Sequence, residues 1–253
     1  MESLVSLNCP ELDVCPYPSP NASIWQDILA QAVTGELMAA MNYRALSTIC
    51  DDPEEVADAL EHAQGEQGHA EAFAIEGSKI GVNVPNNVNA KYWKRIRESF
   101  MRSIAERDFM ACLIVQEIML ESFAVASYTR VGKAGPGSLG KTFAAIAAEE
   151  EGHIEHAMEI LRAERARDPQ RFDDKVYRLH LDVMTTLAEM VGKECRHGQC
   201  DLCHSSCVKP ALSEVGLSTV ELRGASLQQY LKTLDALGLP GEVTLQWITQ
   251  LPV

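Results

Sequence analysis

Two short stretches of the sequence have the residue types and spacing of metal ligands. Glu66 and His69 lie three residues apart in "EQGH", and Glu150 and His153 repeat this arrangement in "EEGH". Side chains three residues apart lie on one face of a helix, so each pair presents a carboxylate beside an imidazole. Each stretch therefore predicts one half of a metal site.

A lone glutamate precedes each pair by almost the same distance. Glu36, in "TGELMAAMNY", comes 30 residues before Glu66, and Glu121, in "MLESFAVASY", comes 29 residues before Glu150. In di-metal helical bundles, two helices supply one glutamate each and two others supply a Glu-x-x-His pair. Carboxylates and imidazoles without a thiolate suit iron or manganese that activates dioxygen. The pattern predicts six ligands: Glu36, Glu66, His69, Glu121, Glu150 and His153.

The sequence alone does not decide the roles of several other residues that could lie near these ligands. Glu117 is a rival to Glu121 one turn earlier, but it lies 33 residues before Glu150, which breaks the regular spacing. Tyr128 either hydrogen-bonds to a ligand or belongs to the core. Three further histidines are interpreted as solvent-facing or outer groups rather than ligands: His62, His156 and His180.

A glycine stands directly before each histidine of the two pairs, at Gly68 and Gly152. A glycine inside a helix costs about 1 kcal/mol relative to alanine. We interpret both as small residues where helix backbones approach each other closely, which would offset this cost.

The elements that must position these residues are helices. Apolar residues recur at helical spacing, and Asp52 followed by Pro53 has the form of a helix start. Because convincing strand alternation is absent from the sequence, the predicted fold class is all-α, a helical bundle. The predicted helices follow Ser23 and Asp52, then cover about 91–130 (in one or two pieces), 141–167, 172–193, 226–237 and 243–251.

Composition narrows the function classes. The chain has 253 residues, a net charge of −14 and 46% hydrophobic residues. This charge argues against nucleic acid or an anionic membrane as the main partner. The N-terminal residues lack the pattern of a signal peptide, and "FMACLIVQEIML" is too short and too polar for a membrane span. We therefore predict a soluble, cytoplasmic protein.

Four of the eight cysteines crowd into thirteen residues near the C-terminal end, at Cys195, Cys200, Cys203 and Cys207. In a cytosolic protein such crowding favours a metal site or redox chemistry over a structural disulfide. The first three share the spacing of plant-type ferredoxins, and zinc could also take four such ligands. Reduced surface thiols without a ligand and thiols that react in turnover are the alternatives.

These residues carry a resemblance to a known family. The stretch "CLIVQEIMLESFAVASY", Cys112 to Tyr128, is similar in order and register to the third metal helix of the aldehyde-deformylating oxygenases, which are ferritin-like proteins. The segments around Glu36, Glu66 and Glu150 match in the same way. The resemblance covers about 24–194 and resumes near residue 226. It selects Glu121 over Glu117 and implies that Glu66 and Glu121 are candidates to bridge two metals.

The resemblance implies four segments: an extended arm (1–23), a ferritin-like di-metal bundle (24–194), an insert rich in cysteine (195–225) and C-terminal helices packed on the bundle (226–253). Such enzymes hold two iron ions, and they use dioxygen and an external electron donor such as a ferredoxin to release the carbonyl carbon of a fatty aldehyde as formate. Glu121, Tyr128, Cys200 and Cys203 are the predicted catalytic residues.

The insert is absent from the resembled family. Two alternatives to an aldehyde-deformylating enzyme therefore stay open, and the first depends on the insert. It could hold an iron–sulfur cluster or zinc, or donate sulfur, as in a branch of this fold associated with forming the thiofuranose ring of a nucleoside antibiotic. The other alternative is a non-catalytic, ferritin-like metal-binding protein.

Overall fold

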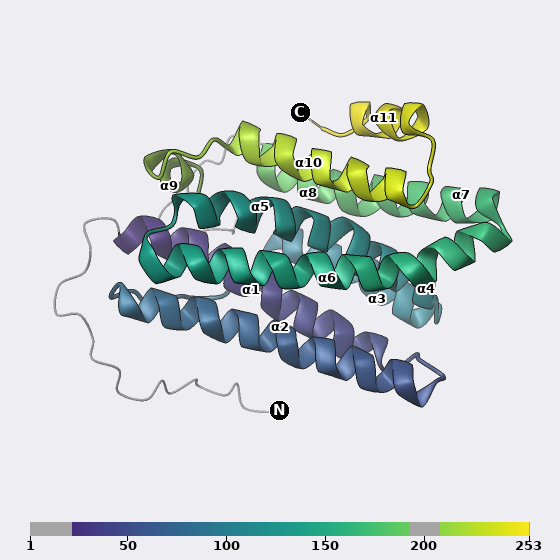
Figure 1. Cartoon of the computed structure of the whole chain (residues 1–253), viewed down its shortest axis with the longest axis horizontal. Helices are drawn as coiled ribbons and strands as arrows, with labels where there is room; N and C mark the ends of the chain where they lie inside the picture. The colour runs from purple at the N-terminus through teal and green to yellow at the C-terminus, as the bar shows by residue number, and fades with distance from the viewer. Residues whose placement is uncertain (1–21, 193–207, 253) are drawn as a thin grey trace.

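The computed structural model describes residues 22–192 and 208–252, and helices make up the regular structure of these residues (Figure 1). The predicted all-α class is confirmed. The elements are α1 (Ala22–Leu46), α2 (Pro53–Lys79), α3 (Lys91–Ala105), α4 (Phe109–Leu113), the π-helical segment η1 (Ile114–Leu120), α5 (Glu121–Ala134), α6 (Gly137–Arg167), α7 (Pro169–Leu179), the π-helical segment η2 (His180–Met184), α8 (Thr185–Gly192), α9 (Val208–Glu214), α10 (Thr219–Ala236) and α11 (Gly241–Thr249).

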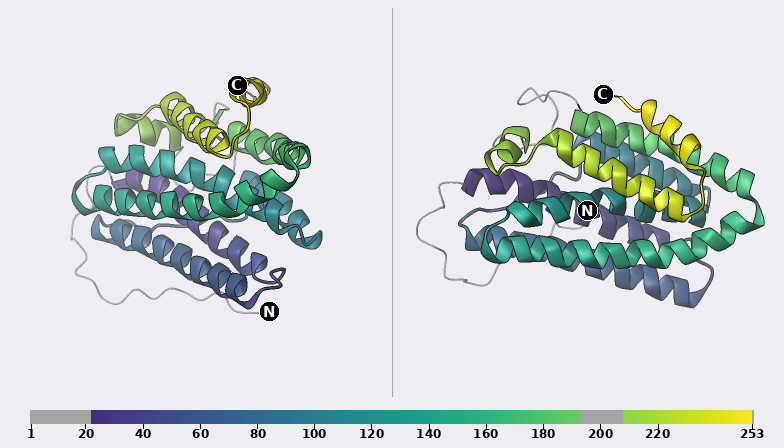
Figure 2. Two further views of the ribbon diagram at one scale, coloured as in Figure 1. Left: turned by 45° about the vertical axis from the view of Figure 1, so that its right-hand side comes forward. Right: turned by 45° about the horizontal axis from the view of Figure 1, so that its top comes forward.

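Two helical hairpins form the centre of the bundle. The α1–α2 hairpin packs against the α5–α6 hairpin, with α2 beside α6, and the long helices run side by side in both views of Figure 2. Helix α3 packs on α1, α10 packs on α5, and both α3 and α10 contact α8. The helices that carry the two predicted half-sites therefore face each other.

Local sequence explains several helix ends. The Asp52 side chain accepts a hydrogen bond from the Glu54 backbone N–H, which confirms the predicted cap of α2. Asp168 does the same for α7 after ending α6. Helix α10 begins earlier than predicted, because Ser218 and Glu221 form a capping box at its start.

The predicted long helix of 91–130 is divided by a turn at Arg107, which has a φ of +51°. No glycine or proline marks this turn in the sequence. The Arg107 guanidinium donates hydrogen bonds to the Ile49 carbonyl and to Asp51, so contacts with the α1–α2 loop hold the turn in place. Asp108 then caps α4.

The glycines that allow close backbone approach are not those predicted. A Cβ added to Gly68 or Gly152 would meet no atom within 4 Å, so our interpretation of these two residues is wrong. The close approach lies instead at the α5–α6 turn, where a Cβ on Gly140 would come within 2.5 Å of the Gly135 carbonyl oxygen.

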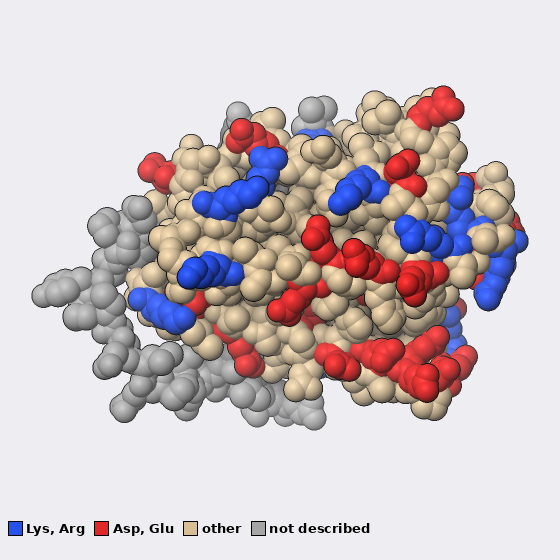
Figure 3. Space-filling model, viewed as in Figure 1, with Lys and Arg blue, Asp and Glu red and all other residues tan. Residues whose placement is uncertain are grey.

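The segment Phe109–Ala134 is long and apolar enough to cross a membrane by length and composition, but 78% of its most apolar window is buried among the other helices. It is therefore the core segment of the bundle. On the surface, acidic side chains gather where α2 begins (Figure 3), which accords with the net charge of the chain.

Candidate metal centre

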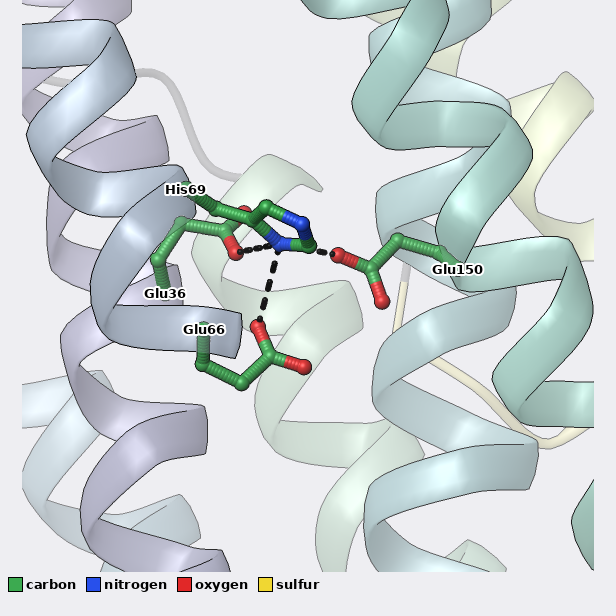
Figure 4. Close-up of side chains that lie close together, drawn as sticks. All are labelled: Glu36, Glu66, His69 and Glu150. Atoms are coloured by element: carbon green, nitrogen blue, oxygen red, sulfur yellow. Dashed lines mark hydrogen bonds and ion pairs between the residues drawn. The ribbon is translucent and has the colours of Figure 1, made fainter. Parts of the chain in front are cut away.

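Four of the predicted ligands converge between the two hairpins. Glu36 from α1, Glu66 and His69 from α2, and Glu150 from α6 each bring a ligand atom within 4.8 Å of all the others (Figure 4). All four side chains are buried. Burying several carboxylates together is costly unless a cation compensates their charge, so this cluster is a candidate metal centre.

The Nδ1 atom of His69 points into the cluster. It lies 3.0 Å from Oε1 of Glu150, 3.2 Å from Oε2 of Glu36 and 3.6 Å from Oε2 of Glu66. Its Nε2 atom lies 2.9 Å from the carboxylate of Glu149, whose side chain is largely exposed. A carboxylate behind a metal-binding imidazole is common, because it fixes the tautomer and the orientation of the ring.

His153 lies beside the same two glutamates. Its Nδ1 atom is 2.8 Å from Oε2 of Glu150 and 3.5 Å from Oε1 of Glu66. Glu66 and Glu150 therefore each direct one oxygen toward each imidazole. Glu150, rather than Glu121, is the residue opposite Glu66 between the two histidines.

Glu121 is buried near the cluster but outside the group of four. Its Oε1 atom accepts a hydrogen bond of 2.6 Å from the Gln116 amide. Burial, together with the charges of Glu150 and Glu66, raises the pKa of Glu121 well above its usual value. The rival Glu117 is equally buried, and it accepts a hydrogen bond of 2.5 Å from the Tyr43 hydroxyl. Burial raises the pKa of Glu117 to about 7.

The pKa values of the imidazoles and carboxylates in this group are shifted in different directions. Burial alone would lower the pKa of His153, but its contacts with Glu150 and Glu66 outweigh burial and raise that pKa to about 10. Burial would raise the pKa of Glu66, but His153 and His69 lower it to about 2. Burial raises the pKa of Glu36 well above its usual value. Protonated imidazoles thus partly neutralise the carboxylates when no metal is bound.

Several atoms of the group lack a well-directed hydrogen bond. Nδ1 of His153, Oε1 of Glu66 and both carboxylate oxygens of Glu150 are buried, and although they lie close to one another, their angles do not suit hydrogen bonds. Orphaned buried polar atoms are rare and require an explanation such as an ion. Lone pairs that converge on a common space fit a metal ligand set, so the residues present suit the predicted metal.

The outer residues have specific contacts. The Tyr128 hydroxyl donates a hydrogen bond to Oε1 of Glu36, and its ring packs on Phe73 and Phe143, so it is both a ligand partner and a core residue. The His62 ring lies 4.6 Å from the His153 ring, which supports the interpretation of His62 as an outer group.

The other two histidines lie apart from the ligands. His156 is exposed, as predicted. His180 is fully buried: its Nε2 donates to the Trp247 carbonyl, and its ring stacks on Tyr230. Our interpretation of His180 as a solvent-facing or outer group is therefore wrong, and it joins α10 and α11 to the bundle. Burial lowers its pKa to about 4.

A cavity of about 160 Å³ opens beside the cluster. Glu36, Glu66, Gln116 and Glu121 line the end that reaches the candidate ligands. The remaining wall is mostly apolar and includes side chains from α1, α3, α5, α8, α9 and α10: among them Ile28, Trp93, Phe123, Val131, Leu187, Leu212 and Leu222. His69 and His153 are not among the residues that line this cavity. An apolar substrate group can thus reach the carboxylate face of the centre.

Some sequence predictions lie outside the described residues. These are the four clustered cysteines, Cys195, Cys200, Cys203 and Cys207, and the extended arm up to residue 21. Sequence reasoning missed two kinds of residue that contact the ligands, namely Gln116 at Glu121 and Glu149 at His69. Only Glu149 had a local signal, as the first residue of the acidic run before His153.

Comparisons with known proteins agree with this fold. The chain has the fold of a solved protein from Synechococcus described as having aldehyde deformylating oxidase activity, with a TM-score of 0.77 at 17% identity over 92% of this chain and 98% of that chain. Residues 22–195 match the family model described as long-chain fatty aldehyde decarbonylase. This chain therefore belongs to the long-chain fatty aldehyde decarbonylase family.

Proposed function

We propose that this protein is a non-haem di-iron oxidoreductase that uses dioxygen to remove the carbonyl carbon of an aldehyde. The observation that carries the proposal is the buried carboxylate and imidazole cluster that opens into an apolar cavity. A purely structural ion-pair network would have no need for such a cavity. The family to which the chain belongs supports an aldehyde as the substrate class.

Six residues would hold the two ions: Glu36, Glu66, His69, Glu121, Glu150 and His153. Glu66 and Glu150 each face both imidazoles, which supports them as the two ligands that both ions would share. Bound iron would supply the electrons that reduce dioxygen. The Tyr128 hydroxyl fixes the position of the Glu36 carboxylate, and Glu149 fixes the His69 ring.

The reaction balances only with an external reductant. One aldehyde, one dioxygen, four electrons and four protons give one alkane, one formic acid and one water. The bond that breaks joins the carbonyl carbon to the alkyl chain, and the carbonyl carbon leaves as formate. We propose a small electron-transfer protein such as a ferredoxin as the donor, and the cytoplasm as the place of the reaction.

Apart from holding the metals, the protein contributes a cavity that binds the substrate. Its wall is mostly apolar, so it binds the alkyl part of the substrate and excludes water from the carboxylate face.

The alternatives have less support. A sulfur-inserting enzyme, or an iron–sulfur or zinc site at Cys195, Cys200, Cys203 and Cys207, would depend on residues outside the described part of the chain, and the family match does not favour it. A non-catalytic metal-binding protein would not require an apolar cavity at the ligands.

The test is anaerobic loading of the full chain with ferrous iron, followed by addition of an aldehyde, a reductant and dioxygen. We expect two irons per chain and formate released in proportion to dioxygen consumed. Glu150→Ala should abolish both, whereas the control Glu151→Ala should not, because Glu151 is the exposed neighbour of Glu150. Uptake of many irons per chain without formate would instead indicate an iron store.

A further inference from the structure

A line of buried and partly buried hydrogen bonds leads from helix α3 to the candidate ligand Glu121. Arg97 on α3 donates a hydrogen bond of 2.5 Å to Oδ1 of Asn42 on α1. Asn42 donates one of 2.7 Å from Nδ2 to Oε1 of Gln116, and Gln116 donates one of 2.6 Å from Nε2 to Oε1 of Glu121. The line therefore joins α3, α1 and the continuous η1–α5 stretch, which are three separate parts of the chain.

The two ends of the line fix its direction. A guanidinium can only donate hydrogen bonds, so the Asn42 oxygen must face Arg97 and its amide nitrogen must face Gln116. The Gln116 oxygen is then used, and its amide nitrogen must face Glu121. A metal-bound Glu121 would be ionised, and an ionised carboxylate can only accept, so the requirement at the far end would be the same. Neither amide can turn over without breaking the line at two points.

Burial makes a broken line costly. Asn42 is 0% exposed, Gln116 is 1% exposed and Glu121 is 3% exposed. A buried amide that loses its partner costs about 1–3 kcal/mol, because no water replaces the lost hydrogen bond. The line is therefore held in one arrangement.

The π-helical segment η1 brings Gln116 and Glu121 together. On an α-helix, residues five apart point about 140° away from each other. Here the wider turn lets the Glu121 backbone N–H bond to the Gln116 carbonyl, five residues earlier. The Gln116 side chain can then reach the Glu121 carboxylate, and both residues line the cavity.

We propose that Arg97, Asn42 and Gln116 are positioning residues that hold Glu121 by one carboxylate oxygen and leave the other oxygen for the metal. This role rests on the metal centre of the proposed function. The line prevents the carboxylate from turning into the cavity, where it would compete with substrate. None of the three residues is itself a ligand, and Arg97 and Asn42 do not touch Glu121.

Two substitutions test the line at different distances from the ligand. Gln116→Leu removes the donor to Glu121. Asn42→Asp keeps size and shape and still accepts from Arg97, but it cannot donate to Gln116, so the Gln116 amide turns over and presents its oxygen to Glu121. Ser122→Ala is the matched control, because it removes a buried hydrogen bond to Thr233 next to Glu121 but outside the line. Arg97→Lys preserves a donor to Asn42 and should largely keep the wild-type iron affinities.

The measurement is anaerobic titration of the full chain with ferrous iron, together with the Mössbauer spectrum of the loaded protein. We expect Gln116→Leu and Asn42→Asp to weaken binding of one of the two irons by about 10–100-fold and to change the spectrum of that iron alone, whereas Ser122→Ala keeps both affinities. Circular dichroism and melting temperature identify a variant that has not folded, in which case Arg97→Leu replaces it.

Three outcomes would overturn the proposal: wild-type iron affinities and spectra in both line variants, an equal loss in Ser122→Ala, or equal weakening of both irons. If the wild-type chain binds no iron, the proposed metal centre fails instead of the line, so the two failures are distinguishable.

Discussion

In the α1–α2 hairpin, the imidazole of His69 is enclosed by carboxylates on both of its ring nitrogens, with Glu149 behind it and Glu36 and Glu150 in front. In the α5–α6 hairpin, the side chain of His153 is 20% exposed, and the ring of His62 lies beside it. The lone glutamates differ too, because Glu36 is held by a tyrosine of the other hairpin, whereas Glu121 is held by an amide of its own helical segment.

The two hairpins thus carry the same types of candidate ligand, but different side chains surround these ligands. Imidazole basicity and carboxylate orientation depend on the groups around the ligands, and these come from positions outside the repeated pattern. The two metals of the proposed centre should therefore differ in affinity, with the ion at His69 bound more tightly. The following predictions test this difference.

The largest expected effect distinguishes a ligand shared by both metal ions from a ligand of one ion only. Glu150 faces both imidazoles, whereas Glu121 contacts neither. Glu150→Ala should therefore remove both irons and reduce turnover by at least about a hundredfold, and Glu121→Ala or His153→Ala should remove at least one. Iron per chain is measured after anaerobic loading and desalting. If Glu150→Ala retains one tightly bound iron, Glu150 serves only one half.

The next prediction concerns the two glutamates of the second hairpin. Glu121 lines the cavity, whereas Glu117 is tied to Tyr43 and does not line it. Glu117→Ala should keep both irons, although it should destabilise the fold by leaving the Tyr43 hydroxyl unpaired, at about 1–3 kcal/mol. Iron content and urea unfolding measure the two effects separately. Loss of iron in Glu117→Ala but not in Glu121→Ala would move the ligand role to Glu117.

The two imidazoles should also titrate differently in the metal-free protein. Contacts with Glu150 and Glu66 outweigh burial and raise the pKa of His153 to about 10, and contacts with Glu150 and Glu36 raise the pKa of His69 further. A raised folded-state pKa contributes stability below about pH 6.5, which is lost as pH rises through 10. The metal-free protein should therefore become less stable between these pH values.

Iron must displace these protons, so its affinity should rise with pH over the same range, and binding near pH 7 should release protons. Proton release in weak buffer and the pH titration of the histidine ring signals by NMR measure both effects. Burial lowers the pKa of His180 to about 4 and His180 lies apart from the ligands, so its signal serves as the internal reference. Release of no protons near pH 7 would contradict protonated imidazoles in the metal-free centre.

A smaller effect is expected at Glu149, for which the described residues offer no counterpart behind His153. Glu149→Gln should weaken the iron at His69 by about tenfold and leave the iron at His153 unchanged, because only His69 loses an anionic partner. Glu151→Gln is the control, since Glu151 is an exposed residue of the same acidic run. Equal weakening of both irons would mean that Glu149 acts through general charge.

The sequence allowed the hairpins and candidate ligands to be predicted because their information is local. A three-residue interval on a helix places Glu66 beside His69 whatever surrounds them, and Asp52 followed by Pro53 begins a helix by itself. Four of the six predicted ligands meet within 4.8 Å, with His153 next to them. The ligand roles themselves stay a prediction.

The contacts around the ligands could not be predicted because tertiary packing decides them. Arg97, Asn42 and Gln116 are far apart in the sequence, and nothing in "LIVQEIML" indicates a π-helical turn. The turn at Arg107 lacks a glycine or proline for the same reason. His180 resembled a surface histidine because the helices that bury it, α10 and α11, lie at the end of the chain.

The smallest expected effect concerns the two glycines that the hairpins share. Gly68 and Gly152 are exposed, and a Cβ at either would meet nothing within 4 Å. Gly68→Ala and Gly152→Ala should each stabilise the protein by up to about 1 kcal/mol, or about 2–4 °C in Tm, with iron content unchanged. The contrast is Gly140→Ala, whose Cβ would meet the Gly135 carbonyl oxygen at 2.5 Å and should lower Tm. If Gly68→Ala or Gly152→Ala lowers Tm or loses iron, that glycine supports the metal centre through its backbone conformation. The hairpin that carries the affected glycine is then the one that tolerates substitution less well.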